Sequence, residues 1–443
     1  MAKRRILVLG GGFAGVGCIR RLESYLGGDP DIELVLVSEN NFLLFTPMLP
    51  QVASGMIETR HIVIPIRDIC KKTTVFYESR VKSIDPYGKV VNLWGRRGKR
   101  GIRIHYDYLV IALGSETNFF DLGSVERHAY TMKTLDDAVI LRNHVIDMLE
   151  QSENETDPVR LRGQLTFVVV GGGFAGIETA GEMMDLLVDA SDRYPHVQKS
   201  DIRVVVVEAL PTILPGFSKG LAEFAYEKLK ERNIEIMTRT AVTSFDGEEV
   251  IIKDIDGDSE PRSMVTKTLI WTAGVTPANT IKRSVLKTER GRIVVNGFLE
   301  VPEHSGVFAI GDCASLQDPK TKRQFAPTAQ IAEAQAKIAA HNLYSSIRGG
   351  EKRRFVFSGR GQMAIIGKRS GIASIFGINV SGFLAWFLWR AIYLSKIPIL
   401  EKRTRVSLDW LIDLFFRRDI ARLKAVGEKA REYQDLDEVD DLW

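Results

Sequence analysis

The sequence predicts an α/β fold made of two similar units, each built around a parallel sheet. The main observation is a near repeat, because residues 10–15 and residues 171–176 both read Gly-Gly-Gly-Phe-Ala-Gly. Each repeat follows an apolar, strand-like run and opens a helix-like segment. A second apolar run then ends at an acid, Glu39 in the first unit and Glu208 in the second. This order is typical of a Rossmann-like unit that binds a dinucleotide.

The glycines of each turn have distinct physical roles. In the pattern Gly-x-Gly-x-x-Gly, the first glycine allows the tight turn and the second lets the backbone approach a pyrophosphate. The third glycine lets the helix pack closely on the strand. Amides at the helix N-terminus then face the phosphate charge. The acid accepts hydrogen bonds from a ribose 2′-hydroxyl, and Glu208 would repel a 2′-phosphate. We therefore expect two dinucleotides per chain, with NADH favoured over NADPH at the second turn.

The chain after the second unit is expected to return to the first. Strand-like runs ending in Gly114 and Gly274 extend the repeat, and residues 306–312 form a further strand that runs into Asp312. A helix is expected from Pro327, a residue suited to a first helical position. The second Rossmann-like domain is then inserted in the first. The expected domains are residues 1–122 with 290–350, residues 123–289, and a C-terminal region of residues 351–443.

Composition and charge narrow the classes of partner. The 443 residues are 45% hydrophobic and carry a net charge of +4, which is too small to predict nucleic-acid binding. Cys18, Cys70 and Cys313 are isolated, so we expect neither a dithiol close in sequence nor a metal site. No apolar leader precedes the first strand, so export is not expected.

The C-terminal region has the chemistry of a membrane-associating or dimer-forming surface. Residues 370–389 lack ionisable side chains but contain several glycines, which favours a broken strand and a helix from about Gly382 over a membrane span. Apolar residues recur on one side of a later helix: Leu408, Leu411, Ile412, Phe415 and Phe416. We expect the following aromatic and basic residues to form an interfacial face: Trp386, Trp389, Trp410, Arg390, Lys396, Lys402, Arg403, Arg405, Arg417, Arg418 and Arg422. Burial of the same face at a dimer contact or against the first domain is an open alternative. Residues 435–441 form an acidic tail.

Several segments together resemble one family over nearly the whole chain. The two glycine-rich turns and the Ile310-Gly311-Asp312 element are similar to flavoproteins with two dinucleotide-binding domains. Within that group, the chain resembles the type II, non-proton-pumping NADH:quinone oxidoreductases. The segments that carry this resemblance are residues 45–50, 271–275, 326–330 and 381–386, with Asp409-Trp410 and Arg418-Asp419.

This resemblance implies that the first turn binds FAD and the second binds NADH. The implied FAD residues are Gly10, Gly12, Phe13, Ala14, Gly15, Glu39, Asn40, Thr46, Val81, Ala112, Gly114, Asp312, Ala329 and Gln330. The implied NADH residues are Gly171, Gly173, Phe174, Ala175, Gly176, Glu178, Glu208 and Gly274. The start of the helix at Pro327–Ala329 would stabilise negative charge on reduced flavin, although this helix could merely pack on the first sheet.

Two residues are implied to act in catalysis, Glu178 and Gln330. Quinone reduction consumes two protons, so a protonatable group near the flavin is useful, and the family makes Glu178 the proton-relay residue. A carboxylate at a helix start without chemistry is the alternative, and Glu182 lies one turn further along the same face. The family's second pocket glutamine is replaced by Ala334, and Gln335 is displaced by one residue. We expect a wider or differently polar quinone pocket.

The expected activity is transfer of hydride from NADH to FAD and then of two electrons to a membrane quinone, without proton pumping. A homodimer bound peripherally to the cytoplasmic face of the cell membrane is expected. One alternative is a sulfide:quinone oxidoreductase, which needs cysteines near the flavin. Another is a soluble flavoprotein reductase of a protein electron carrier.

Overall fold

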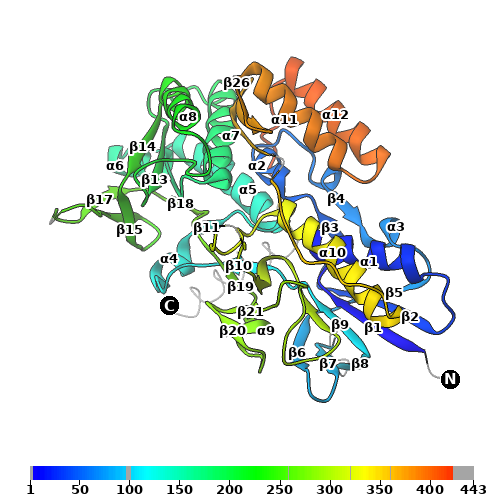
Figure 1. The fold of residues 1–443 in the computed structure, drawn as a ribbon. Coiled ribbons are helices and arrows are strands. Elements are labelled where there is room, and N and C mark those ends of the chain that lie inside the picture. The colour runs from blue at the N-terminus through cyan, green and yellow to red at the C-terminus, as the bar shows by residue number, and fades with distance from the viewer. Residues whose placement is uncertain (1–2, 96–100, 258, 320, 360, 423–443) are drawn as a thin grey trace, which may run out of the picture.

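Two five-stranded parallel sheets form the centres of two units in the computed structural model, which describes residues 3–95, 101–257, 259–319, 321–359 and 361–422 (Figure 1). The first sheet has the order β22-β9-β1-β2-β5. Its strands are β1 (Arg4–Leu9), β2 (Ile32–Ser38), β5 (Thr74–Glu78), β9 (Tyr108–Ile111) and β22 (Val307–Ala309). The apolar side chains of β1 and β9 are buried, as expected where helices cover both faces of a sheet.

The second sheet repeats this design with the order β11-β18-β12-β13-β14. Its strands are β11 (Tyr130–Thr131), β12 (Thr166–Val170), β13 (Arg203–Glu208), β14 (Ile234–Thr238) and β18 (Thr268–Trp271). Strands β10 (Ser115–Thr117) and β19 (Val275–Pro277) pair antiparallel, each shortly after the strand that ends in Gly114 or Gly274. The α/β class and the duplicated units are therefore confirmed.

Close packing makes both glycine-rich turns necessary. Helix α1 (Phe13–Leu26) follows the first turn and α7 (Phe174–Ser191) follows the second. A Cβ on Gly15 would lie 1.8 Å from the carbonyl oxygen of Gly10, and one on Gly176 would lie 1.8 Å from that of Gly171. Gly10 and Gly171 also have φ of +112° and +108°, a region that favours glycine.

The chain returns to the first sheet after the second unit. Strand β22 pairs parallel with β9, so residues 307–309 complete the sheet that began at residue 4. Helix α10 (Ala329–Arg348) then packs against α1. The second unit is thus inserted in the first, while the domain boundaries stay predictions. Thr328, not Pro327, caps α10, and its hydroxyl accepts the Ile331 N–H at 3.4 Å. The helix therefore starts two residues later than predicted.

The remaining elements extend the two units. In the first they are β3 (Phe42–Leu44), α2 (Leu49–Ala53), β4 (Val63–Pro65), α3 (Ile66–Ile69), β6 (Val81–Asp85), β7 (Val90–Leu93), β8 (Ile102–His105), β20 (Thr288–Glu289), β21 (Arg292–Val294) and β23 (Ala314–Ser315). In the second they are α4 (Gly123–His128), α5 (Leu135–Ser152), α6 (Pro158–Leu165), α8 (Lys219–Glu231), β15 (Thr240–Phe245), β16 (Glu249–Asp254) and β17 (Arg262–Val265). Helix α9 (Asn279–Lys282) packs against β6 and β21 of the first unit.

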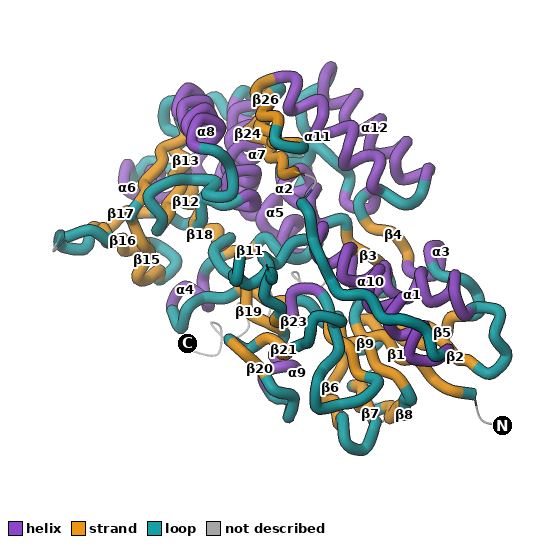
Figure 2. Tube along the Cα trace, viewed as in Figure 1, coloured by secondary structure: helices purple, strands orange, loops and turns teal. Residues whose placement is uncertain are grey.

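A small sheet and two helices make up the C-terminal region. Strands β24 (Gly361–Gly367), β25 (Ser370–Ile375) and β26 (Ile378–Gly382) precede α11 (Phe383–Lys396) and α12 (Leu400–Phe415). The predicted strand and the helix start after Gly382 are confirmed. The two helices lie side by side (Figure 2). Among the residues that the structure describes, no helix is long and apolar enough to cross a bilayer. The predicted acidic tail lies outside the described residues.

Candidate functional site

A cavity of about 760 Å³ opens at the carboxyl ends of the first sheet, beside the first glycine-rich turn. This is the edge where open α/β sheets bind ligands. Nine of the predicted FAD residues line it: Gly10, Gly12, Phe13, Glu39, Asn40, Thr46, Val81, Ala112 and Gly114. Ala14 and Gly15 lie in the first turn of α1, next to these residues.

The lining of this first cavity fits a flavin dinucleotide. Gly12 precedes α1 without a side-chain cap, so the first amides of the helix have no side-chain partner and suit a pyrophosphate. Asp312 is not among the residues that line this cavity, but it contacts the lining residue Ser115, whose hydroxyl donates to the carboxylate at 2.7 Å. The ammonium of Lys133 lies 3.9 Å from the same carboxylate. Ser115 and Lys133 both line the cavity, and sequence reasoning missed them because neither belongs to a motif.

A second cavity of about 740 Å³ adjoins the first. Phe13, Thr46 and Lys133 line both cavities, so the two meet at these residues. The second cavity brings together predicted residues from both units: Phe174, Ala175 and Glu178 of α7, and Ala329 and Gln330 of α10. The start of α10 faces it through Pro327, Thr328 and Ala329.

The second glycine-rich turn is tied to Glu208 at the end of β13. The Glu208 carboxylate accepts the backbone N–H of Gly172 at 2.5 Å and that of Leu210 at 2.7 Å. A Cβ on Gly172 would lie 3.1 Å from Cβ of Glu208. Glu39, in contrast, is largely exposed and lies 3.9 Å from Arg80. Gly274 has φ of +73°, and a Cβ there would lie 2.5 Å from the Phe120 ring.

Glu178 is a buried carboxyl group in the wall of the second cavity. Its carboxylate accepts the backbone N–H of Ile365 at 3.0 Å. Burial raises the pKa of Glu178 to about 8, and the Glu182 charge adds to that rise. Glu182 is not among the residues that line this cavity, because Arg418 holds it at 3.0 Å. The structure therefore separates the two acids, and Glu178 is the one at the cavity.

Comparison with known proteins agrees with this geometry. Residues 4–336 match the family model described as pyridine nucleotide-disulphide oxidoreductase, and residues 360–419 match the NDH2 C-terminal domain. A probable mitochondrial NADH-ubiquinone oxidoreductase of Schizosaccharomyces pombe is 30% identical, over 95% of this chain and 84% of that protein. The chain belongs to the type II NADH:quinone oxidoreductases. A member of this family from Mycobacterium tuberculosis is 28% identical, over 94% of this chain and 89% of that protein.

Solved structures confirm the family's fold for this chain. The structure of NDH2 from Plasmodium falciparum in complex with NADH has a TM-score of 0.87 at 20% identity, over 95% of this chain and 100% of that one. The sulfide:quinone oxidoreductase of Aquifex aeolicus has a TM-score of 0.71 at 19% identity, over 94% of this chain and 96% of that one. FAD and NADH are the cofactors of this type II enzyme family, and the residues that line the first cavity fit FAD.

The type II pocket glutamines are rearranged in this chain. Gln330 lines the second cavity, and its side-chain amide donates to the carbonyl of Gly361 at 3.1 Å. Gln335 points elsewhere, since its buried side chain accepts the Gly311 N–H at 2.6 Å. Glu333, one residue before Ala334, lines the cavity instead. Glu333 thus places an acid in the lining of this pocket, whereas the wider or differently polar quinone pocket stays a prediction.

Helix α11 adds pocket residues that the sequence analysis did not assign. Tyr393 and Lys396 line the second cavity. The Tyr393 ring packs on Trp389 with centroids 4.4 Å apart and meets Phe45 at 6.2 Å. Lys396 was predicted on a membrane face, because a helix pattern shows which residues share a face but not which part of the protein that face contacts.

The cysteines do not favour sulfur chemistry at the flavin. Burial raises the pKa of Cys18 and Cys70 to about 12 and that of Cys313 to about 11. Cys313 lies beside Asp312 but is fully buried, and its thiol donates to the Ile310 carbonyl at 3.3 Å. A thiolate is the reactive form of cysteine, so all three are poor sulfur carriers.

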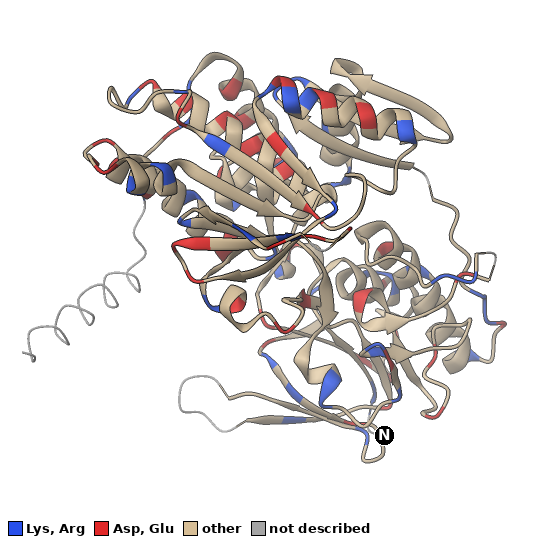
Figure 3. Ribbon diagram, turned by 90° about the vertical axis from the view of Figure 1, so that its left-hand side faces the viewer, with Lys and Arg blue, Asp and Glu red and all other residues tan. Residues whose placement is uncertain are grey.

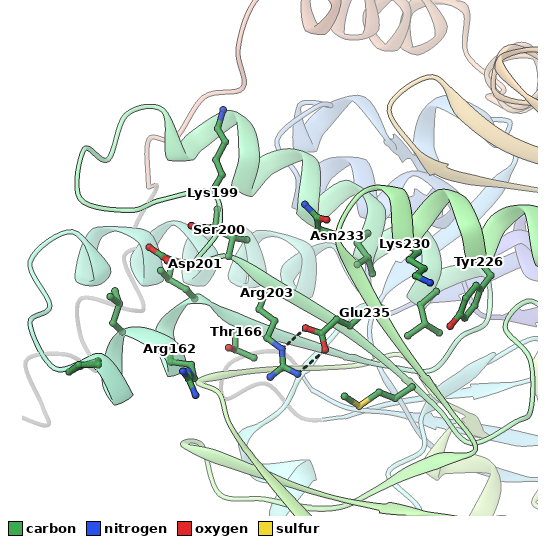
Figure 4. A pocket seen from close by; sticks show the side chains of 17 residues that line it. Arg162, Thr166, Lys199, Ser200, Asp201, Arg203, Tyr226, Lys230, Asn233 and Glu235 are labelled. Carbon is green, nitrogen blue, oxygen red and sulfur yellow. Dashed lines mark hydrogen bonds and ion pairs between the residues drawn. The ribbon is translucent and has the colours of Figure 1, made fainter.

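A third cavity of about 970 Å³ lies at the opposite edge of the second sheet, where β12, β13 and β14 begin (Figure 4). Arg203 and Glu235 form a two-bond ion pair in its wall, at 2.6 and 2.8 Å (Figure 4). It is the largest of the three cavities described, but neither glycine-rich turn reaches it. We therefore assign no nucleotide to it.

The C-terminal helices expose only part of the predicted interfacial face. Leu408, Leu411, Ile412, Phe415 and Phe416, which the spacing places on one side of a helix, are exposed. However, Trp386, Trp389, Trp410, Arg390 and Arg418 are buried, so their assignment to the interfacial face was wrong. The physical reason is mutual packing, because the Arg390 guanidinium lies 3.9 Å from the Trp386 ring centre and 4.8 Å from that of Trp410.

Proposed function

We propose that this protein oxidises NADH at bound FAD in the first cavity and reduces a membrane quinone in the second. When bound, FAD accepts a hydride from NADH and passes on two electrons. The balanced reaction is NADH + H⁺ + quinone → NAD⁺ + quinol. The observation that carries the proposal is the junction of the two cavities at Phe13, Thr46 and Lys133. The first glycine-rich turn lines the first cavity, and Phe174 and Ala175 of the second turn line the second.

Glu178 and Gln330 are the proposed catalytic residues. The buried Glu178 carboxyl can hold a proton near neutral pH, which suits a donor to a quinone oxygen. Gln330 offers an amide to the same space. The start of α10 directs its helix dipole toward the junction and would stabilise negative charge there. Each predicted FAD and NADH residue keeps the role given above as part of this proposal.

The exposed side of α11 and α12 is the proposed membrane surface. It carries ten exposed apolar side chains: Phe383, Leu384, Phe387, Leu400, Leu408, Leu411, Ile412, Leu414, Phe415 and Phe416. So many exposed apolar residues on one helix pair favour contact with lipid or a partner subunit. Elsewhere, Lys and Arg are interspersed with Asp and Glu (Figure 3). We propose peripheral binding at the cytoplasmic face, where NADH is supplied, and a homodimer.

The test of this function is anaerobic stopped-flow absorbance on the purified protein. We expect NADH to bleach a flavin band and a menaquinone or ubiquinone analogue to restore it. A colourless protein that cannot be reconstituted with FAD would overturn the proposal. If NADH bleaches the flavin band but neither quinone restores it, quinone reduction is excluded and the protein is a flavoprotein reductase of another acceptor. Sedimentation analysis in detergent tests the homodimer separately.

A further inference from the structure

A buried ion pair connects the end of the C-terminal helix pair to the helix that carries Glu178. Arg418 lies two residues beyond Phe416, the C-cap of α12, and its side chain is 2% exposed. Its guanidinium donates to the Glu182 carboxylate at 3.0 Å and to the Glu182 backbone carbonyl at 3.0 Å. The Ser54 hydroxyl donates to the same carboxylate at 2.9 Å. Both charges are thus buried, and each has hydrogen-bond partners.

The position of Glu182 gives this pair a connection to the cavity. Glu178 and Glu182 are separated by four residues on α7, so their side chains lie on one face, one turn apart. Glu178 faces the cavity, whereas Glu182 faces the loop that carries Arg418. A charge fixed on Glu182 therefore acts on Glu178 through a short, water-poor path.

We propose that Arg418 is a positioning residue for quinone reduction. It fixes Glu182 as a buried carboxylate one turn from Glu178, so the C-terminal segment sets the pH at which Glu178 gives up its proton. This inference rests on the proposed proton-donor role of Glu178.

Other charged groups surround Glu178 and Glu182. Burial raises the pKa of Glu182, whereas the charge of Arg418 lowers it. Asp413 binds the Arg418 Nε at 3.3 Å, and Asp185 is paired with Arg232. The titratable or charged groups that face Glu178 or Glu182 are Asp185 and Asp189 on α7, Glu333 on α10, Arg390, Tyr393 and Lys396 on α11, Asp413 on α12, Arg232 after α8, Lys133 before α5, and Arg418. Arg418 is the one that contacts the Glu182 carboxylate directly.

The direction of the shift in the pKa of Glu178 follows from the charge of Glu182. A Glu182 carboxylate makes it harder for Glu178 to ionise, because two like charges would share a buried site. Without Arg418, Glu182 would take up a proton rather than remain an unpaired buried charge. The negative charge beside Glu178 would then be lost, and Glu178 would release its proton at lower pH. Loss of Arg418 should therefore have the same effect as neutralising Glu182.

The experiment measures flavin reoxidation by a water-soluble benzoquinone across pH 5.5 to 9.5, for the full chain with FAD bound. We expect Arg418→Gln and Glu182→Gln each to shift the alkaline fall of the rate to lower pH by about one unit. The double variant should shift it no further, because both substitutions remove the same charge. Flavin reduction by NADH should be unchanged in all three.

Matched variants separate the possible outcomes. Arg417→Gln removes the neighbouring cation, which is exposed and bound to Asp192 at 3.1 Å, and should not move the profile. If Arg418→Gln does not fold, the pH profile of the double variant is compared with that of Glu182→Gln instead. The double variant leaves no unpaired buried charge. A profile unmoved in Glu182→Gln, or shifts that add in the double variant, would overturn this inference only. A profile that Glu178→Gln leaves unchanged would overturn the Glu178 role and this inference together.

Discussion

The carboxylate of Glu208 accepts a hydrogen bond from the backbone N–H of Gly172 at 2.5 Å, across the second glycine-rich turn. A second bond from the Leu210 N–H fixes the other carboxylate oxygen. The acid is therefore held in place, and its remaining lone pairs are directed by the backbone rather than by solvent. A rigid carboxylate suits a ribose 2′-hydroxyl and opposes a 2′-phosphate.

Replacement of this acid should change nucleotide preference. In Glu208→Ser, we expect the ratio of kcat/KM for NADH to that for NADPH to fall at least about tenfold, because the repulsive charge is gone. Steady-state rates with both nucleotides measure this ratio. Glu39→Ser, at the matching position of the first unit, serves as control and should leave the ratio unaltered. An unchanged ratio in Glu208→Ser would argue against its ribose role.

Loss of the acid in the second cavity should affect only the quinone half-reaction. In Glu178→Gln, we expect flavin reoxidation by quinone to slow by about a hundredfold, the usual contribution of a positioned proton donor. Reduction by NADH should remain fast. In the wild type, reoxidation should fall as pH rises through about 8, where Glu178 loses its proton. Glu333→Gln, in the same cavity, is the control and should keep this pH dependence.

The same carboxyl should lower stability as pH rises. Its pKa is raised from 4.5 to about 8 in the folded protein, so the folded state binds more protons than the unfolded state between these values. The unfolding free energy therefore decreases from pH 4.5 to about pH 8 on account of this group. The melting temperature of Glu178→Gln should rise relative to wild type over this window. A constant difference between the two proteins would contradict a buried, protonated Glu178.

Substitution of the last glycine in each turn should affect one dinucleotide site and leave the other intact. Gly15→Ala should prevent FAD binding, because the added Cβ meets the Gly10 carbonyl at 1.8 Å. Gly176→Ala should retain the flavin but lose reduction by NADH, since its Cβ meets the Gly171 carbonyl at 1.8 Å. Flavin absorbance and stopped-flow reduction distinguish these results. Gly220→Ala, a helical glycine with open space around it, should behave as wild type.

The exposed face of α12 should govern membrane binding. Leu408 and Phe415 are 50% and 75% exposed, and burying such a side chain contributes about 1.5–3 kcal/mol. The double change Leu408→Gln and Phe415→Gln should weaken sedimentation with anionic vesicles by tenfold or more. Val159→Gln, at a 61% exposed apolar residue of the second unit, is the control. Equal binding by both variants would place the membrane surface elsewhere.

The sequence alone determined the duplicated architecture and predicted nine of the residues that line the first cavity. Glycine-rich turns depend on local backbone geometry, so residues 10–15 and 171–176 specify their own conformation, and the acids at 39 and 208 follow from strand length. The spacing of residues 408–416 likewise placed their apolar side chains on one helix face, and the structure shows that this face is exposed. These features can be predicted from sequence because they depend on interactions between residues that are close together in the chain.

Only the tertiary structure decided which charged and aromatic groups lie inside. Arg418 and Trp410 look like surface residues in an amphipathic pattern, but α7 and α11 bury them by supplying Glu182 and Arg390 as partners. The junction of two cavities at Thr46 and Lys133 also joins segments far apart in sequence. Helical periodicity assigns a side chain to a face, whereas burial and pKa depend on what packs against that face.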